Sequence, residues 1–289
     1  FYGYYERFWK KNPKNSDVWE EAHPEWFAKG YEGKPPQMCY TEPGFIEQVI
    51  EDARHYFDGK GKPYKAVAAG DYFALVPMDN SSYCKCERCR AFRTPDAASK
   101  HFTNGLWSDY IFTFVNKVAR EIKKTHPDKY LAALAYSKYA GYPKDVKIED
   151  NVSVQLCLHV RNVFDPAMQE NDVDFFKSWV EKEKDRRLFA WLYYCFPEHI
   201  VNRSEGEKFC FPGFFAHGIE TWYRRFHKAG IRGAFFNGCG QHVENYLSFE
   251  LLDDCTQDVD VLLDDYFTRY YGPAATPMKE LYLAIEETF

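Results

Sequence analysis

Short apolar runs alternate with segments of helical periodicity along most of this 289-residue chain. Six runs have the length and the turn-residue boundaries of buried strands: 37–41, 72–78, 130–136, 152–159, 188–195 and 233–237. Apolar residues at helical spacing predict helices at 45–57, 106–122, 172–183, 218–229, 243–252, 258–271 and 276–288. Strand–helix alternation with near-continuous apolar strands is typical of a parallel sheet covered by helices. The sequence therefore predicts an α/β fold.

The fold expected from this pattern is a (β/α)8 barrel of the TIM type, which needs eight strands. Because six strands are found, the first one or two β/α units should be missing. The chain opens on Phe1 without an initiator methionine, and we interpret it as a fragment or a processed form. Residues 1–289 would then be one N-terminally truncated barrel domain, including the C-terminal helices from about 243. The alternative is an open doubly wound sheet, but no glycine-rich phosphate fingerprint follows any strand.

The composition bears on the class of partner. The formal net charge is −6, and basic residues form no stripe, which argues against nucleic acid as the main partner. No apolar run approaches the roughly 18–20 residues that span a bilayer. Aromatic residues make up 19% of the chain, and those left outside the core would suit the flat faces of sugars. We therefore expect a carbohydrate partner, no nucleic acid and no membrane span.

Polar side chains follow the predicted strands at the positions where barrels and open α/β sheets place their active sites. The candidate catalytic carboxylates are Asp79, Glu198 and Glu244. The candidate substrate-binding residues are Asn80, His159, Arg161, Trp191, Tyr194, Asn237, Gln241 and His242. Carboxylates, amides, aromatic rings and an arginine on one face are typical of a carbohydrate site. A glycosidase needs one carboxyl group as proton donor and one as base or nucleophile.

Each of these candidates also has a purely structural interpretation. Asp79 could stabilise a turn, Glu198 could be a solvated loop residue, and Glu244 opens a helix, where the dipole favours an acid. Trp191 and Tyr194 alternate with apolar residues, a pattern that favours the core over a sugar platform.

Three cysteines stand close together after the second predicted strand, in the pattern Cys84-x-Cys86-x-x-Cys89. Three thiols within six residues are similar to a zinc knuckle, but zinc takes four ligands. The fourth ligand would be Cys39, His101 or another distant residue. The alternatives are free thiols or a local disulfide. A structural zinc would stiffen the loop that follows the strand, and no other cofactor is expected.

A further set of motifs extends over nearly the whole chain. The set comprises His23-Pro24-Glu25-Trp26-Phe27-Ala28, Gln37-Met38-Cys39, Asp79-Asn80 with the cysteine pattern, Trp191-Leu192-Tyr193-Tyr194, Phe211-Pro212-Gly213-Phe214-Phe215-Ala216-His217, Gly230-Ile231-Arg232-Gly233 and Tyr270-Tyr271-Gly272-Pro273-Ala274-Ala275. Together these motifs resemble a bacterial glycosidase-like family known as domain of unknown function 4838. The resemblance implies a relative of α-glucuronidases and β-hexosaminidases with a TIM-type catalytic barrel, and hence a bacterial carbohydrate-active enzyme.

The resemblance also implies that many members of this family carry a glutamate near the end of the last strand. Here the stretch reads Phe235-Phe236-Asn237-Gly238, so Phe236 takes the place of that glutamate. The resemblance then implies that Glu198 or Glu244 serves instead, or that hydrolytic activity is reduced or different. We predict a glycoside hydrolase that acts on an oligosaccharide or an acidic sugar. The alternative is a non-catalytic carbohydrate-binding barrel, and a metal-dependent hydrolase ranks last because three thiolates usually mark a structural zinc site.

Overall fold

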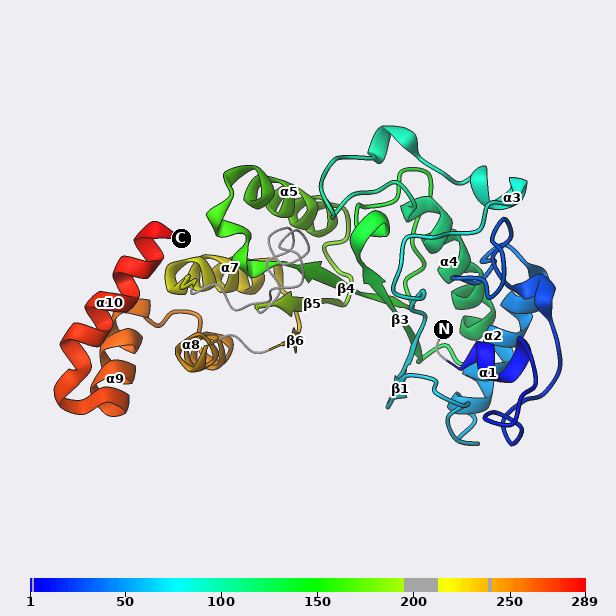
Figure 1. Cartoon of the computed structure of the whole chain (residues 1–289), viewed down its shortest axis with the longest axis horizontal. Helices are drawn as coiled ribbons and strands as arrows, with labels where there is room; N and C mark the ends of the chain where they lie inside the picture. Colours follow the sequence, from blue (N-terminus) through cyan, green and yellow to red (C-terminus); the bar gives the residue numbers. More distant parts are fainter. Residues whose placement is uncertain (2, 195–212, 239–240) are drawn as a thin grey trace. The chain divides into compact units, whose positions relative to one another are not determined.

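A computed structural model describes residues 1, 3–194, 213–238 and 241–289 of the chain (Figure 1). The chain divides into two compact units. Unit 1 comprises 1–155 and 185–187, and unit 2 comprises 156–184 and 188–289. Six strands are hydrogen-bonded in the order β1-β2-β3-β4-β5-β6. Strand β4 (Val152–Leu158) contributes residues to both units.

Unit 1 contains the first strands and the helices that cover them. Its strands are β1 (Ala68–Ala69), β2 (Tyr72–Ala74) and β3 (Tyr130–Ala135), and its helices are α1 (Tyr4–Phe8), η1 (Pro24–Trp26), α2 (Pro43–Phe57), α3 (Glu87–Arg90), η2 (Pro95–Ala97), α4 (Ser108–Thr125) and η3 (Ser137–Tyr139). Strand β2 pairs antiparallel with β1 and parallel with β3, with Phe73 opposite Leu131. Helices α2 and α4 lie side by side (Figure 1). Each turns an apolar stripe inward, at Phe45 and Val49 in α2 and at Phe114 in α4, as amphipathic helices do.

A buried ion pair joins α1 to α2. Both guanidinium nitrogens Nη1 and Nη2 of Arg7 reach the carboxylate of Asp52, at 2.6 and 2.9 Å. The Tyr4 hydroxyl donates to the same carboxylate at 2.7 Å, and the Arg7 Nε donates to Glu20 at 2.5 Å. Because Arg7 and Asp52 are both buried, their charges are compensated mainly by each other.

Unit 2 contains the last two strands and all of the C-terminal helices. Its strands β5 (Leu188–Tyr193) and β6 (Ala234–Asn237) are parallel, with Leu192 opposite Phe236. Its helices are η4 (Val160–Phe164), α5 (Pro166–Lys182), α7 (Ala216–Ala229), α8 (His242–Asp253), α9 (Val259–Tyr271), η5 (Gly272–Ala274) and α10 (Ala275–Thr288). The side chains of Asp165 and Asp258 cap the first turns of α5 and α9.

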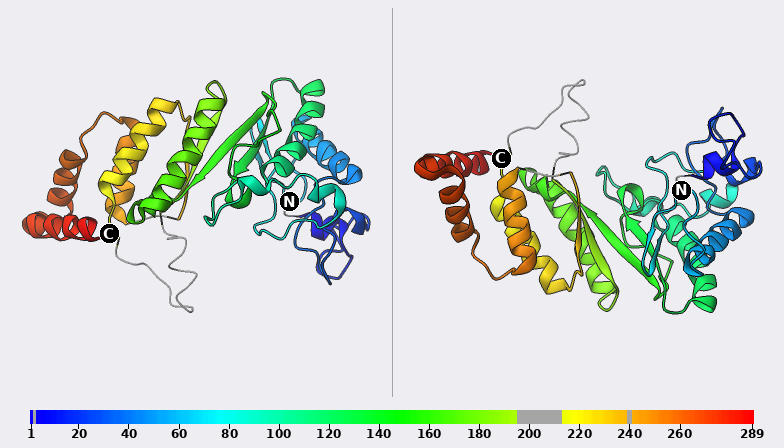
Figure 2. Two further views of the ribbon diagram at one scale, coloured as in Figure 1. Left: turned by 90° about the horizontal axis from the view of Figure 1, so that it is seen from above. Right: turned by 90° about the horizontal axis from the view of Figure 1, so that it is seen from below.

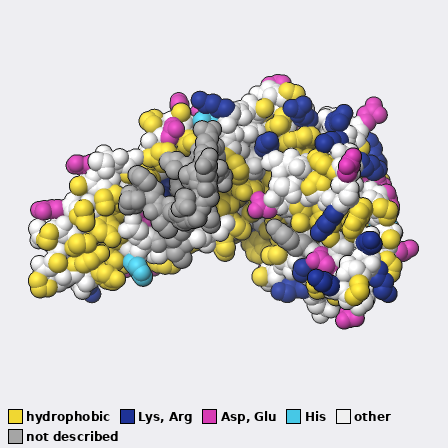
Figure 3. All heavy atoms as spheres, viewed as in Figure 1, with side chains coloured by type: hydrophobic (Ala, Val, Ile, Leu, Met, Phe, Trp, Pro, Cys, Tyr) yellow, Lys and Arg dark blue, Asp and Glu magenta, His cyan; other side chains and the backbone are white. Residues whose placement is uncertain are grey.

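Helices α9 and α10 pack against each other in unit 2 (Figure 2). Hydrophobic side chains gather on the surface of this part of unit 2 (Figure 3). Val261 and Tyr270 of α9 and Leu281 of α10 are exposed. Within the described part of the chain, no helix is long and apolar enough to cross a membrane.

The prediction of a truncated (β/α)8 barrel is wrong. The described residues form a series of six strands, whose first two strands are antiparallel. In a TIM barrel all neighbouring strands are parallel. The predicted strand at 37–41 is also absent, because Met38 makes only an isolated bridge with Phe27. The chain turns directly afterwards, and the unpredicted strand β1 pairs with β2 instead. The other five strands and all seven helices are found, although β2 ends at Ala74 rather than 78, α5 begins at Pro166 rather than 172, and residue 195 of the predicted strand 188–195 lies outside the described residues.

Candidate functional site

Four cysteine side chains meet in unit 1. The Sγ atoms of Cys39, Cys84, Cys86 and Cys89 all lie within 4.8 Å of one another, and those of Cys39 and Cys89 are 3.6 Å apart. A zinc ion bonded to four thiolates at about 2.3 Å separates the sulfurs by about 3.8 Å in a tetrahedron. Three of the thiols are buried and Cys86 is half-buried. The cage therefore fits a closed tetrathiolate metal site, and Cys39 rather than His101 completes it.

The backbone brings these cysteines together from two distant segments. Cys39 follows the bridge residue Met38, and its amide donates to the Trp26 carbonyl at 2.8 Å. Cys84 and Cys86 precede α3, and Cys89 lies within that short helix. The sequence pattern identified the three closely spaced thiols, but Cys39 is 50 positions from Cys89, so only the fold could select it.

Hydrogen bonds from neighbouring groups point at the sulfurs. The Lys29 amide donates to Cys84 Sγ at 3.3 Å, and the Tyr110 hydroxyl donates to Cys89 Sγ at 3.0 Å. The Tyr110 oxygen itself accepts from the Tyr40 amide at 3.1 Å, so its own hydrogen is free to point to the sulfur. Such bonds orient metal ligands and favour thiolates over thiols. Without a metal, the hydrogen bonds that Cys39 makes with Cys84 and Cys89 lower the pKa of the Cys39 thiol. The same hydrogen bonds raise the pKa of the Cys84 and Cys89 thiols.

Asp79 lies in unit 1, in the loop between β2 and the cysteine pattern. Its side chain is exposed, and no hydrogen bond or ion pair to it is found among the described residues. The side chain of Asn80 is engaged locally, since its Nδ2 donates to the Pro36 carbonyl at 2.9 Å and its Oδ1 accepts from the Ser82 amide at 2.9 Å. Asn80, and not Asp79, is therefore the residue that stabilises this turn.

Gln37, which the sequence places in the motif Gln37-Met38-Cys39 but does not mark as a site residue, also lies in this region. Its side chain is fully buried, and its amide group makes hydrogen bonds to Met78 and Asn80, on both sides of Asp79. The only signal in the sequence is a polar residue directly before the apolar pair Met38-Cys39. Buried amides of this kind must be hydrogen-bonded, but the partner cannot be read from spacing.

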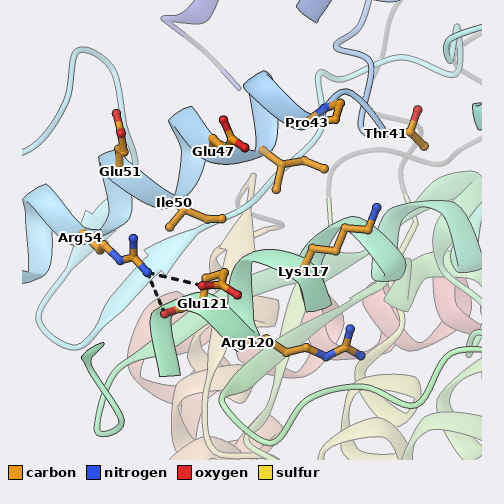
Figure 4. A pocket seen from close by; sticks show the side chains of 10 residues that line it. Thr41, Pro43, Glu47, Ile50, Glu51, Arg54, Lys117, Arg120 and Glu121 are labelled. Atoms are coloured by element: carbon orange, nitrogen blue, oxygen red, sulfur yellow. Dashed lines mark hydrogen bonds and ion pairs between the residues drawn. The ribbon is translucent and has the colours of Figure 1, made fainter. Parts of the chain in front are cut away.

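A pocket of about 600 Å³ lies on the surface of unit 1 between α2 and α4. Figure 4 shows Arg54 of α2 reaching Glu121 of α4, to its carboxylate at 3.7 Å and to its carbonyl at 3.2 Å. Lysine, arginine and glutamate side chains line most of this pocket, and Ile46 and Ile50 contribute to its apolar lining. None of the predicted site residues is among its lining residues.

Glu244 is the predicted catalytic carboxylate that lies in unit 2. It is only 2% exposed, and its Oε2 accepts from the Gln241 backbone amide at 2.8 Å, which closes a capping box at the start of α8. Its Oε1 has no hydrogen-bond partner among the described residues. Burial raises the pKa of Glu244 to about 7, against the opposing effects of the Gln241 hydrogen bond and the Arg161 charge. Such a carboxyl group can retain a proton near neutral pH and donate it.

Three of the predicted substrate-binding residues are buried in unit 2. The Tyr194 hydroxyl lies 3.0 Å from that of Tyr223 and 2.7 Å from that of Ser248, so this ring packs in the core. Arg161 donates from Nη1 to the Tyr194 carbonyl at 3.3 Å. The ring of His159 stacks on Tyr193, with centroids 4.7 Å apart.

The other predicted residues of unit 2 are more accessible. Trp191 is half-buried, and its ring centroid lies 4.3 Å from that of Phe235. Asn237 ends β6, and Gln241 is the N-cap of α8, where its Nε2 donates to the Gly213 carbonyl at 2.8 Å. His242 is exposed beside Tyr270. Glu198 lies outside the described residues.

The predicted carboxylates do not cluster within one unit. Asp79 belongs to unit 1, whereas Glu244 belongs to unit 2 together with His159, Arg161 and Gln241. What the structure does bring together is the four-cysteine centre beside the Asp79 loop in unit 1, and Glu244 with Gln241 in unit 2. Each unit therefore has one candidate site of its own.

A family model described as Domain of unknown function (DUF4838) matches residues 3–284. No curated protein matches the chain, and no solved structure does.

Proposed function

This chain belongs to the family described as Domain of unknown function (DUF4838), and we propose that it is a glycoside hydrolase acting on an oligosaccharide or an acidic sugar. The observation that carries the proposal is Glu244. A buried carboxyl group with a pKa near 7, and with one oxygen that has no hydrogen-bond partner within the described ranges, suits the proton donor of a glycosidase.

In the proposed reaction, Glu244 gives its proton to the glycosidic oxygen as the bond to the sugar breaks. The Gln241 amide orients the carboxyl group through Oε2, so the proton would be carried by Oε1, which is buried and has no hydrogen-bond partner among the described residues. A second, ionised carboxylate must act as base or nucleophile. The sequence prediction offers Asp79 and Glu198 as candidates for this second carboxylate, without assigning the acid and the base between them; Asp79 belongs to unit 1, and Glu198 lies outside the described residues. The carboxylate of Asp79 is exposed and makes no hydrogen bond with the described residues, which supports Asp79 as a candidate.

We also propose that Cys39, Cys84, Cys86 and Cys89 bind one structural Zn²⁺. Four thiolates fill the coordination sphere of zinc and leave no open position for a reacting water, which is the arrangement of structural rather than catalytic sites. The support is the sulfur cage, which is close to tetrahedral size, and the hydrogen bonds from Lys29 and Tyr110. The ion would tie the Cys39 segment to the loop after β2.

A panel of aryl glycosides and aryl uronides tests the hydrolase proposal. The wild-type chain should release the aryl group from at least one member. The Glu244→Gln variant should lose about 10²–10⁴-fold in turnover, whereas Glu287→Gln, a change at an exposed position on α10, should leave turnover unchanged. Saturable binding of sugars without turnover of any member would favour a non-catalytic carbohydrate-binding protein over the enzyme.

Elemental analysis tests the metal proposal. Purified chain should contain about one zinc, and Cys39→Ser should reduce this content, because three thiolates bind zinc more weakly than four. Substoichiometric zinc together with four freely titrating thiols would contradict the proposal.

A further inference from the structure

The backbone on both sides of Asp79 is bound by a single buried side chain, that of Gln37. The Gln37 Oε1 accepts from the Met78 amide at 3.2 Å. Its Nε2 donates to the Met78 carbonyl at 2.6 Å and to the Asn80 carbonyl at 2.9 Å. The residues directly before and after Asp79 are thus fixed, while the Asp79 carboxylate itself is exposed.

Gln37 is in turn held rigidly in place. It is 0% exposed, and its Oε1 also accepts from the Tyr40 hydroxyl at 2.7 Å. Its backbone carbonyl accepts from the Ala28 amide at 2.8 Å. Two residues further on, Cys39 enters the four-cysteine centre. A short, hydrogen-bonded path therefore runs from the sulfur cage through Gln37 to the peptide groups on either side of Asp79.

We propose that Gln37 is a positioning residue that fixes Asp79 for catalysis and transmits metal occupancy at Cys39 to the Asp79 loop. The inference rests on the proposed hydrolase function. A turn would normally be fixed by its own side chains, and Asn80 already serves this turn. A second, buried clamp from a distant segment fits a carboxylate that must be both exposed and precisely placed. Misplacement of a reacting group by about 1 Å can cost on the order of 10²-fold in rate.

A double-mutant cycle separates positioning from a general structural role. Gln37→Met has a similar volume but loses every side-chain hydrogen bond to the loop. It should lower turnover per folded molecule at least about 10-fold with Asp79 present. In the Asp79→Asn background it should cause no further loss, because Gln37 acts only through Asp79. Gln169→Met, the same change at a half-buried position on α5, should leave turnover unchanged. An equal loss in both backgrounds would overturn the inference.

Hydrogen exchange gives a readout that does not depend on turnover. The Met78 amide donates to Gln37 Oε1, so Gln37→Met should speed its exchange, whereas Gln37→Glu keeps the acceptor and should speed it less. Removal of the metal with a chelator should speed the same amide in the wild type, with a much smaller change in Gln37→Met. Unchanged Met78 exchange in Gln37→Met, or under chelation, would overturn the inference. If the wild type hydrolyses none of the glycosides, the hydrolase proposal fails, and this exchange measurement still decides whether Gln37 holds the loop.

Discussion

Replacing Glu244 by glutamine should stabilise the protein at alkaline pH while it removes activity. The folded-state pKa of Glu244 is about 7, against an ordinary value of 4.5. Because the folded state binds this proton more tightly than the unfolded state, the free energy of unfolding falls as the pH rises from about 4.5 to 7. The shift of about 2.5 pKa units corresponds to about 3 kcal/mol at full ionisation.

Glutamine removes this dependence and keeps the local structure. Its side-chain oxygen can still accept from the Gln241 amide, so the capping bond at the start of α8 is preserved. Above pH 8, Glu244→Gln should therefore be more stable than the wild type by up to about 3 kcal/mol. Near pH 4 the two should be about equally stable, since Glu244 is then protonated in both the folded and the unfolded chain.

Urea unfolding between pH 4 and 8.5 measures the effect. The exposed substitution Glu287→Gln is the control and should follow the wild type throughout. Two parallel stability curves for wild type and Glu244→Gln across this range would refute the reasoning. They would mean that Glu244 titrates alike in the folded and unfolded states, and that its burial has no energetic consequence.

Three further outcomes follow from the structure. Cys39→Ser should lose stoichiometric zinc and have a lower thermal midpoint. Cys255→Ser, outside the four-cysteine centre, should keep the wild-type zinc content and thermal midpoint. Full zinc content in Cys39→Ser would contradict this ligand set. Asp52→Asn leaves the buried Arg7 charge with only the partly exposed Glu20 and should cost about 3–5 kcal/mol in urea unfolding, against at most about 1 kcal/mol for Lys65→Met at the surface pair with Glu6. Asp79→Asn should reduce turnover at least about 10²-fold with little change in the thermal midpoint; reduced stability with an intact rate would identify Asp79 as a turn residue.

The helices could be predicted from the sequence because their signal is local. In α4, apolar residues recur at Tyr110, Phe114 and Val118, and this spacing places them on one buried face. The closure of a sheet depends instead on which strands pair across long separations, which local periodicity does not encode. A barrel and a six-stranded series with an antiparallel first pair therefore give the same pattern of runs. The segment 37–41 was misassigned because nothing local reveals that Gln37 is bound to Met78 and Asn80.

The candidate sites were predictable to a similar extent. The pattern from Cys84 to Cys89 was visible as a ligand group, whereas Cys39 remained one of several options until the fold placed it. Glu244 was visible as an acid at a helix start, but its burial and raised pKa follow from tertiary packing within unit 2. Residue type and spacing thus identified groups capable of chemistry, and only the tertiary structure supplied their environment.

The central claim, that Glu244 is the proton donor of a glycoside hydrolase, is tested most directly by varying the leaving group. A substrate with a weakly basic leaving group, such as a dinitrophenyl glycoside, needs little protonation as its bond breaks, whereas an alkyl or sugar leaving group needs full protonation. Glu244→Gln should therefore cleave the dinitrophenyl glycoside nearly as fast as the wild type in the bond-breaking step, and should lose about 10²–10⁴-fold on the poorer leaving group. An equal loss on both substrates, or no loss on either, would contradict the assignment of Glu244 as the acid.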